Sequence, residues 1–372
     1  MKKVHAIIPI WGKPYIDAFL QWALPALSSP GNLGGVPPDS AVSVHLVTRP
    51  EDAQTLDTAP GVVALRRFIP IRVVASKRAD FTLGGYAAFN ACYLDAMADA
   101  WRERAAVMLL TADQIWADGS LTYILDCAAR GAKAVMTAGL RVLETITPAL
   151  ADELATPRGG VTPATLACLA TEYLHPWDRA LVHDAQNEAQ PASFQLWNAP
   201  GAGILMRCLH LHPVYLELSG QPEKLSRTVD AGSLVRDHCP DVSRVHVIPT
   251  SAHAMHVSIA PPEQSAHLVD YPRGNWRAMA NWALTMGISR HNLFYMRQSI
   301  RIISENADDP CWGEAEAKAA EFCDPLLAWL DNPLRLAYSS VSYKARNNPF
   351  LTRSRGLRAV YRMTKKRLHL EY

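Results

Sequence analysis

Apolar runs of strand length alternate with segments of helical periodicity through residue 140, and this alternation is the strongest constraint on the fold. The strand-length runs cover residues 4–10, 42–48, 62–65, 71–75, 105–110 and 133–137, and the helical patterns cover residues 14–27, 86–103 and 120–130. Such alternation is typical of βαβ units and predicts an α/β protein with a mostly parallel sheet flanked by helices. The run at 105–110 contains no polar residue, as expected for a central strand that is buried on both faces.

The carboxyl ends of the predicted strands are where a binding site is expected. Ligands of open parallel sheets bind in the crevice outside the carboxyl ends of the strands. In this chain the segments that follow the strands are 9–13, 48–49 and 111–118. We therefore expect functional side chains in these three segments.

The pattern changes after residue 145, which predicts a second part with a different organisation. Residues 146–200 are interrupted by polar residues and prolines, strands are expected at 201–206 and 245–248, and residues 276–323 are mostly helical. We divide the chain at these changes into residues 1–145, 146–260, 261–345 and 346–372.

Basic residues are concentrated at the C-terminus. Residues 353–372 contain seven Lys or Arg and one acid, Glu371, so this tail carries +6 and leaves −4 on residues 1–352 of a chain whose net charge is +2. A mildly acidic body argues against a nucleic-acid-binding protein. The tail is a solubilising end, a nucleic-acid patch or an amphipathic helix on an anionic membrane, and we favour the membrane surface.

Composition predicts a folded, cytoplasmic protein. Hydrophobic residues make up 49% of the chain and charged residues 19%, which excludes disorder for most of it. No apolar run reaches the roughly 18–20 residues of a membrane span. The seven cysteines are scattered without a CxxC pair, so we expect buried thiols in a reducing compartment. If the tail docks as favoured above, the protein is peripheral on the inner face of the membrane.

Asp113 is the strongest candidate for chemistry. The apolar run at 105–110 is followed by Thr111-Ala112-Asp113, and a helix is expected to begin at Ser120. A carboxylate at this edge can hold a divalent cation, and the cation can neutralise a diphosphate. The alternative is that Asp113 only caps a loop. For Asp118, turn and helix-capping chemistry is the favoured interpretation.

This arrangement resembles the GT-A glycosyltransferases, in which an apolar strand is followed by Asp-x-Asp and a helix. The resemblance covers roughly residues 4–260 and implies a Rossmann-like nucleotide-sugar-binding half at 1–145 and an acceptor-binding half at 146–260. The helical region at 261–345 and the basic tail at 346–372 lie outside it. It makes Asp113 the metal-binding acid, with Thr111 in place of the first Asp and Ala112 between them. It also assigns the loop after the first strand, with Pro9 and Trp11, to the base, and Thr48 and Arg49 to further nucleotide contacts.

The resemblance continues in order through the second half. Gly201 and Gly203 match a Gly-rich strand that lies under the donor sugar, where small residues let a ligand approach the backbone. Asp230 matches the acid that deprotonates the acceptor hydroxyl in inverting enzymes, and a helix N-cap is an equal alternative. His253 and His256 match a late segment that supplies a metal ligand. The implied cofactor is Mn²⁺ or Mg²⁺, and imidazole suits Mn²⁺ better.

Three other side chains are candidates for contact with the acceptor or the sugar. His210 and His212 are two residues apart and would share one face of a strand. Neighbouring ligands for zinc are absent in the sequence, so a sugar contact or a bond within the core is favoured. Trp177 could stack on a sugar, although a loop Trp more often packs over a core.

The chain lacks the GxxxxGK[ST], GxGxxG, HExxH and GxSxG motifs, which argues against several other enzyme classes. We therefore expect a metal-assisted glycosyltransferase that uses a nucleotide-diphosphate sugar and a glycan or lipid-linked acceptor. The alternatives are a GT-A-like binding or scaffold protein without catalysis, and a sugar nucleotidyltransferase. The short, Gly-poor segment Trp11-Gly12-Lys13-Pro14 disfavours the nucleotidyltransferase.

Overall fold

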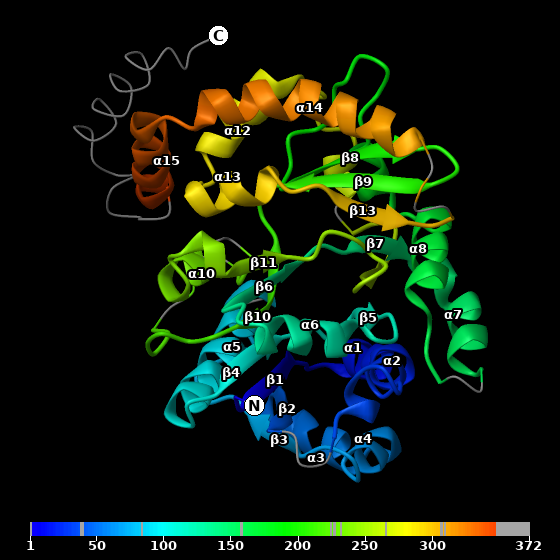
Figure 1. Ribbon diagram of the computed structural model, residues 1–372. Helices are drawn as coiled ribbons and strands as arrows, with labels where there is room; N and C mark the ends of the chain where they lie inside the picture. Colours follow the sequence, from blue (N-terminus) through cyan, green and yellow to red (C-terminus); the bar gives the residue numbers. More distant parts are fainter. Residues whose placement is uncertain are drawn as a thin grey trace.

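The centre of the molecule is a seven-stranded sheet with the order β11-β6-β10-β4-β1-β2-β3 (Figure 1). Its strands are β1 (Val4–Pro9), β2 (Val42–Thr48), β3 (Ile71–Ala75), β4 (Ala106–Leu109), β6 (Ala134–Thr137), β10 (His212–Leu216) and β11 (Val245–Val247). β10 runs antiparallel to both neighbours, β4 and β6, and the remaining pairs are parallel. The predicted α/β class with a mostly parallel sheet is confirmed. The structure, a computed structural model, describes residues 2–37, 41–82, 85–156, 159–223, 225, 228–230, 233–264, 266–305, 308 and 310–346.

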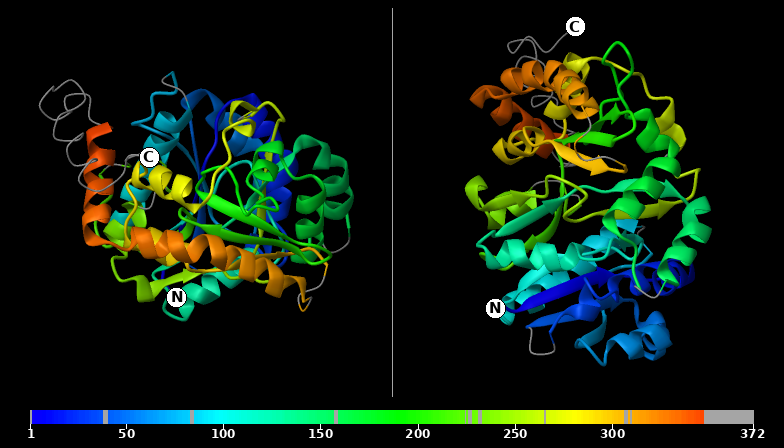
Figure 2. Two further views of the ribbon diagram at one scale, coloured as in Figure 1. Left: turned by 90° about the horizontal axis from the view of Figure 1, so that it is seen from above. Right: turned by 45° about the vertical axis from the view of Figure 1, so that its right-hand side comes forward.

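Two three-stranded sheets lie beside this central sheet. The first has the order β5-β12-β7, with β5 (Gln114–Trp116), β7 (Leu140–Leu143) and β12 (His256–Ala260). The second has the order β13-β9-β8, with β8 (Phe194–Ala199), β9 (Gly203–Cys208) and β13 (Ile300–Ile303). An isolated bridge between Thr250 and Arg301 joins β13 to the segment after β11. Figure 2 shows the sheets stacked along the molecule, with the N-terminal strands at one end and the late helices at the other.

The helices of the first half connect the parallel strands. They are α1 (Lys13–Ala18), α2 (Leu24–Leu27), α3 (Pro50–Thr58), α4 (Pro60–Leu65), α5 (Gly85–Arg102) and α6 (Ser120–Ala129). α5 packs against β1, β2 and β4. A π-helical turn at Phe19–Ala23 joins α1 to α2, just before Pro25. The wider turn accommodates a proline ring that would clash with the carbonyl of an ordinary α-helix.

The helices of the second half are spread over the molecule, and the last ones in the chain form the end opposite the N-terminal strands (Figure 1). They are α7 (Thr147–Leu154), α8 (Pro163–Glu172), α9 (Pro176–Ala180), α10 (Ser233–His238), α11 (Ala266–Val269), α12 (Trp276–Leu284), α13 (Arg290–Met296), α14 (Cys311–Leu330) and α15 (Pro333–Arg346). A second apolar core joins α12, α13 and α14 to β8 and β9, so it takes residues from both sides of the predicted boundary at residue 260. Among the described helices, none is long and apolar enough to cross a membrane.

The structure corrects two of the predicted elements. The run at 62–65 is helical as part of α4, because Pro60 starts the helix and Val62 and Leu65 face the core at a spacing of three. The strand predicted at 201–206 begins at Gly203, since residues 200–202 turn the β8–β9 hairpin. The stretch at 276–323 is mostly helical, as predicted, and contains the short strand β13. The basic tail at 353–372 lies outside the described residues.

Two buried histidines stack at the amino-terminal end of the central sheet. The rings of His5 and His45 lie 4.1 Å apart, and both residues are almost fully buried. Burial, together with the neighbouring His5 and Arg72, lowers the pKa of His45 to about 4, although Glu103 opposes this. Glu103 bonds Lys3 and Arg72, and these bonds hold its pKa at about 2 despite its partial burial. At neutral pH the His45 imidazole is therefore uncharged.

We expect the free energy of unfolding to fall as the pH is lowered from about 6.5 towards 4, because the unfolded chain then binds protons that the folded His45 excludes. Replacing His45 with Phe keeps a ring in the stack and should remove roughly 3 kcal/mol of this loss between pH 7 and pH 4. Urea unfolding at several pH values measures the slope. The exposed His267→Phe variant is the control, and an unchanged slope in His45→Phe would contradict the assignment.

Candidate functional site

A pocket of about 680 Å³ opens at the carboxyl ends of β1 and β4, and we call it the main pocket. Its lining residues come from the end of β1 and the start of α1, from the segment after β4, from α5 and the segment before it, and from the β5-β12-β7 sheet and the segment after β12. They are Pro9, Ile10, Trp11, Tyr15, Phe81, Tyr86, Ala88, Phe89, Thr111, Ala112, Asp113, Gln114, Arg141, Ser258, Ala260 and Gln264. The structure thus brings together five of the predicted site residues: Pro9, Trp11, Thr111, Ala112 and Asp113.

Aromatic rings form one wall of the main pocket. Trp11 lies edge-on to Phe81 with ring centroids 5.2 Å apart, and it approaches Phe89 at 6.2 Å. Tyr15 and Tyr86 stand at the opening and are 61% and 74% exposed. A wall of ring faces and edges can stack against a planar or apolar ligand group.

The loop that carries Trp11 is held by a carboxylate from α3. Asp52 accepts a hydrogen bond of 2.7 Å from the backbone N–H of Gly12 and one of 2.6 Å from Nε of Arg49. Burial works to raise the pKa of Asp52, but the Arg49 guanidinium and the Gly12 N–H together hold it below its usual range. Arg49 and the fully buried Thr48 therefore lie behind the loop and outside the lining of the main pocket. Their predicted role as nucleotide contacts stays a prediction.

Asp113 is fixed by the residue that replaces the first acid of the expected motif. Thr111 donates a hydrogen bond of 2.5 Å from its hydroxyl to Oδ1 of Asp113. The backbone N–H of Thr111 donates to Oε1 of Gln114 at 3.1 Å, so this short loop bonds to itself. Asp113 is half-buried on the pocket wall, between the end of β4 and the start of β5. Its carboxylate is positioned before any ligand arrives.

Asp230 lies at the same edge of the sheet as Asp113. The pKa of the Tyr93 hydroxyl is raised mainly by burial. The negative charges of Asp113 and Asp230 raise it further, so both carboxylates lie near this ring. Both also act on His212, whose pKa is lowered by burial in spite of them. Asp230 is exposed, and the hydroxyl of Thr228 bonds to it. The structure therefore places the two acids at one edge of the sheet, with Asp230 outside the lining of the main pocket, and the catalytic role of Asp230 stays a prediction.

His210 and His212 do not share one strand. β10 begins at His212, and His210 lies in the segment between β9 and β10. Nε2 of His212 bonds the carbonyl of Leu109 at 2.5 Å, so this ring closes the end of β4. His210 is buried, with 9% of its surface exposed. Neither residue lines the main pocket, and their contact with an acceptor stays a prediction.

The donor set at the main pocket limits how a metal could be held. Within the described part of the chain, no three His, Cys, Asp or Glu side chains come together as ligands of one ion. Of the predicted ligands, Asp113 lines the main pocket. This fits Mg²⁺ or Mn²⁺ bound by one carboxylate with water and substrate phosphates, which is how Mg²⁺ is commonly held. It does not fit an ion enclosed by protein ligands alone.

The two histidines predicted as metal ligands lie in different surroundings. His253 is exposed and stacks on Tyr123 with ring centroids 4.7 Å apart, outside the main pocket. His256 is buried against Trp116, and both of its ring nitrogens lack a hydrogen-bond partner among the described residues. Burial, with the nearby His212, lowers the pKa of His256 to about 3. A neutral ring can ligate a metal, and for both residues that role stays a prediction.

Arg141 is a pocket residue that sequence reasoning missed. It lies on β7, where Leu140 and Val142 face the core and Arg141 faces the other side. Its guanidinium sits 5.9 Å from the ring of Trp177, and its backbone N–H donates to Oδ2 of the fully buried Asp178 at 2.7 Å. The alternation of apolar and polar or partly exposed positions along 140–143 was the sequence signal that could have placed Arg141 on the face opposite the core. Trp177 thus packs beside a pocket cation, and its contact with a sugar stays a prediction.

The two predicted donor-sugar glycines lie in the β8–β9 hairpin, outside the lining of the main pocket. Gly203 has φ near +149°, and a side chain there would collide with the carbonyl oxygen of Ile302 on β13. Gly201 has φ near +73° in the turn. Strand pairing and turn geometry therefore account for these glycines, and their contact with the donor sugar stays a prediction.

No protein-family model and no curated protein matches the sequence. Among solved structures, a 4-diphosphocytidyl-2C-methyl-D-erythritol synthase from Anaerococcus prevotii aligns with TM-score 0.25 and 19% identity over 37% of this chain and 55% of that one. A mannosyltransferase from Pyrobaculum calidifontis, in complex with GDP-Man and Mn²⁺, gives TM-score 0.32 and 12% identity over 98% and 84%. A mannose-1-phosphate geranyltransferase from Thermus thermophilus gives 0.20 and 17% over 37% and 42%. The chain thus spans about half the length of the first of these structures and less of the third, and scores this low establish neither a shared fold nor a function.

The buried Asp178 should make stability depend on pH in the opposite sense to His45. Burial raises the pKa of Asp178 to about 6, although Arg141 opposes this. The folded state therefore holds a proton that the unfolded chain releases, so this contribution to stability is lost as the pH rises from about 4 to 6. Asp178→Asn keeps an acceptor for the Arg141 N–H and should flatten that part of the profile.

The comparison is Asp178→Ala, which leaves the Arg141 N–H without its partner and should cost about 1–3 kcal/mol at all pH values. Urea unfolding between pH 4 and pH 8 measures both variants. Equal profiles for Asn and Ala would refute the assigned bond.

Proposed function

We propose that the protein is a glycosyltransferase that moves a sugar from a nucleotide-diphosphate donor to a glycan or lipid-linked acceptor, assisted by a divalent cation. One observation carries the proposal: aromatic rings and a pre-positioned carboxylate line the same pocket at the carboxyl edge of a mostly parallel sheet. The rings suit a nucleotide base, and the carboxylate suits a cation that accompanies a diphosphate. The order of elements in the GT-A resemblance supports the same assignment.

In this proposal each residue in or near the main pocket has a separate role. Trp11 and its aromatic neighbours stack on the base, and the Asp52 contact to Gly12 keeps the loop in place. Asp113 holds the cation, which when bound stabilises the negative charge of the leaving diphosphate. Arg141 supplies a second positive charge across the pocket. Asp230, at the same edge and exposed, accepts the proton of the acceptor hydroxyl.

The alternatives are disfavoured by particular contacts. A sugar nucleotidyltransferase needs a phosphate-binding loop after the first strand, but α1 begins at Lys13, four residues after β1 ends at Pro9. The side chain of Lys13 is 85% exposed and pairs with Asp17 on its own helix. A scaffold without catalysis would not need two acids at one edge, nor the bond by which Thr111 holds Asp113.

Two finer parts of the proposal rest on the tail. A lipid-linked acceptor and docking on an anionic membrane both depend on residues 353–372, which lie outside the described residues. A cytoplasmic location belongs to the same proposal. The residues of the main pocket give no indication of the acceptor lipid, of membrane docking or of the location in the cell.

Binding of nucleotide-linked sugars should require both the pocket and the cation. We expect at least one of a panel of UDP-, GDP- and CMP-linked compounds to bind more tightly with Mn²⁺ than with EDTA. Asp113→Asn should abolish that gain, weakening binding by about tenfold or more, because the amide loses the charge that attracts the ion. Isothermal calorimetry measures both effects.

The matched control is Asp57→Asn. It removes one exposed carboxylate of α3, which pairs with Arg66 and lies outside the lining of the main pocket. It should bind like the wild type. If no compound of the panel binds, the glycosyltransferase proposal fails. If the compounds bind equally with Mn²⁺ and EDTA, the role of Asp113 fails while the pocket assignment stands.

Asp230→Asn should separate chemistry from binding. The amide cannot accept a proton, so we expect the turnover rate to fall by about 10²–10⁴-fold while the donor Kd stays unchanged. Donor consumption in the presence of acceptor gives the rate, and calorimetry gives the Kd. Asp237→Asn, on the neighbouring helix α10, is the control and should keep full activity. An Asp230→Asn variant with wild-type turnover would rule out the general-base role.

A further inference from the structure

The segment that follows β3 is anchored to α5 by one carboxylate, that of Asp95. Its Oδ2 accepts hydrogen bonds from the Ser76 hydroxyl at 2.6 Å, from the backbone N–H of Lys77 at 2.8 Å and from the backbone N–H of Arg78 at 3.0 Å. Its Oδ1 lies 3.0 Å from Nε of Arg78. Four donors from three consecutive residues therefore converge on one side chain, which is only 18% exposed.

Two further hydrogen bonds fix the path of this segment. The backbone N–H of Ser76 donates to the carbonyl of Thr48 at 2.8 Å, which continues the pairing of β3 with β2. The Ser76 hydroxyl accepts a bond of 3.1 Å from the backbone N–H of Ala79. The segment is therefore held both by a neighbouring strand and by a helix as it leaves the sheet.

The anchored segment leads to Phe81, whose ring lines the main pocket. Phe81 is partly buried against the core, and its ring lies 5.2 Å from that of Trp11 in an edge-on arrangement. Trp11 comes from the loop after β1, which Asp52 holds through the backbone N–H of Gly12. The two rings thus meet from two loops, and each loop is held by a carboxylate on a helix.

α5 is a common support for these contacts. The hydroxyl of Tyr93 ties the helix to the carbonyl of Leu110, directly after β4, and Asp95 follows two residues later. Phe89 on the same helix lines the main pocket, whereas Asp95 lies outside its lining. Any effect of Asp95 on a ligand in the pocket must therefore pass through the segment that it holds.

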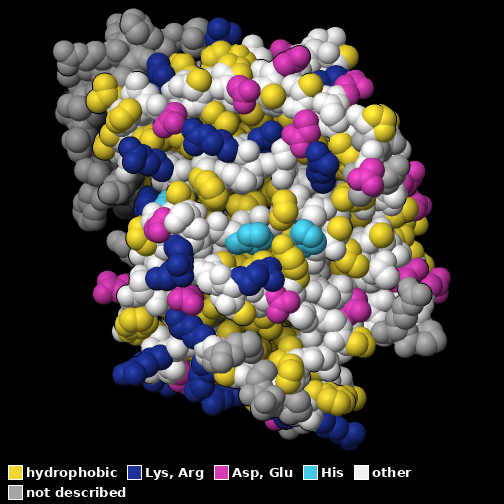
Figure 3. All heavy atoms as spheres, in the orientation of Figure 1, with side chains coloured by type: hydrophobic (Ala, Val, Ile, Leu, Met, Phe, Trp, Pro, Cys, Tyr) yellow, Lys and Arg dark blue, Asp and Glu magenta, His cyan; other side chains and the backbone are white. Residues whose placement is uncertain are grey.

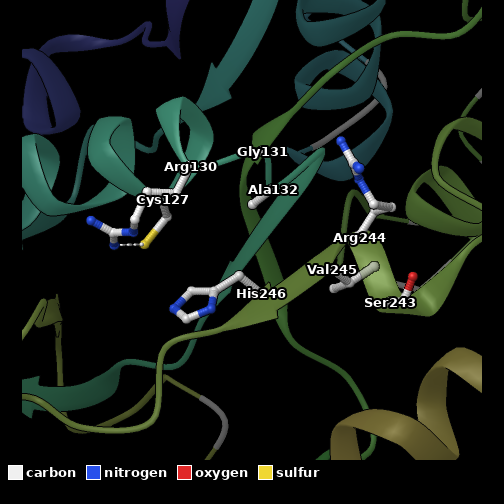
Figure 4. Close-up of a pocket in the computed structure, with 8 residues that line it drawn as sticks. All are labelled: Cys127, Arg130, Gly131, Ala132, Ser243, Arg244, Val245 and His246. Carbon is white, nitrogen blue, oxygen red and sulfur yellow. Dashed lines mark hydrogen bonds between the residues drawn. The ribbon is translucent and has the colours of Figure 1, made fainter.

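The smaller pocket between α6 and β11, of about 300 Å³, lacks such a convergence of polar groups. Arg130 and Arg244 both line it, but in Figure 4 they lie on opposite sides of the Gly131–Ala132 segment and point away from each other. Figure 3 shows Lys and Arg side chains scattered over one face of the molecule, so a basic side chain there does not by itself mark a binding site.

We propose that Asp95 is a positioning residue for the donor. By holding the segment after β3, it sets the ring of Phe81 against Trp11 and completes the aromatic wall before the nucleotide base arrives. A ring that is already in place costs less conformational entropy on binding than one that must be ordered by the ligand. This inference rests on the proposed function, because it assumes that the wall receives the base.

The test is the Kd for the tightest-binding member of the panel of UDP-, GDP- and CMP-linked compounds, measured by isothermal calorimetry with Mn²⁺. Asp95→Ala and Phe81→Leu should each weaken binding by about tenfold, because each leaves the wall incomplete. Adding Asp95→Ala to Phe81→Leu should cost less than about twofold more, since the ring through which Asp95 acts is already gone. Asp99→Ala removes an exposed carboxylate of α5 that pairs with Arg102, and this control should bind like the wild type.

Formate provides a readout that a general loss of structure would not move. Asp95→Ala removes only the carboxylate group, and formate has the size and charge of the missing group. We expect formate to recover most of the affinity that Asp95→Ala loses, because it again accepts the bonds of the segment after β3. Chloride at the same ionic strength should not do so, and formate should leave Phe81→Leu unchanged.

A thermal unfolding midpoint near that of the wild type shows that each variant is folded. If Asp95→Ala does not fold, Asp95→Asn keeps one acceptor oxygen and should weaken binding by about threefold. A wild-type Kd in the folded Asp95 variant, additive losses in the double variant or no recovery in formate would overturn the inference and leave the proposed function standing. If no compound of the panel binds to the wild type, the proposed function fails and this inference fails with it.

Discussion

The end of strand β4 is the point from which the candidate site is built. Its last backbone carbonyl groups are buried, and a buried carbonyl needs a hydrogen-bond partner. Nε2 of His212 bonds the carbonyl of Leu109, and the hydroxyl of Tyr93 donates to the carbonyl of Leu110 at 2.6 Å. Tyr93 belongs to α5 and His212 to β10, so these two bonds hold both elements at the end of β4. The chain then enters the lining of the main pocket with Thr111 and Asp113. The position of Asp113 therefore depends on the hydrogen bonds to the last carbonyl groups of β4 and of the residue after it.

Charge explains why the main pocket would need a cation. Asp113 lines the pocket, Asp230 lies at the same edge of the sheet, and the body of the chain outside the basic tail carries a net negative charge. An anionic donor would be repelled by these acids unless a metal ion stood between them and its phosphates. Arg141 offers one positive charge, but Asp178 behind it offsets part of that charge.

Sequence reasoning located the strands and one side of the site well, and its failures have physical causes. The run at 62–65 has a composition that suits strand or helix, and the preceding proline decided for helix. Arg141 carried no motif, because its importance comes from the neighbours that tertiary packing gives it. The glycines at 201 and 203 suggested a ligand approach, whereas a hairpin turn and the close contact with β13 account for them. His210 and His212 looked like a pair on one strand, but the chain passes from one sheet to another between them.

The sequence by itself determined the parallel sheet and the placement of Trp11 and Asp113 at its carboxyl edge. Both follow from local information, since the hydrophobic period sets each strand and the next residues must emerge at its end. Tertiary structure alone decided which distant residues joined them. Arg141 reaches the main pocket from β7, and Asp230 lies at the same edge of the sheet as Asp113. These meetings depend on strand order and on packing between segments far apart in the chain, and no local pattern records them.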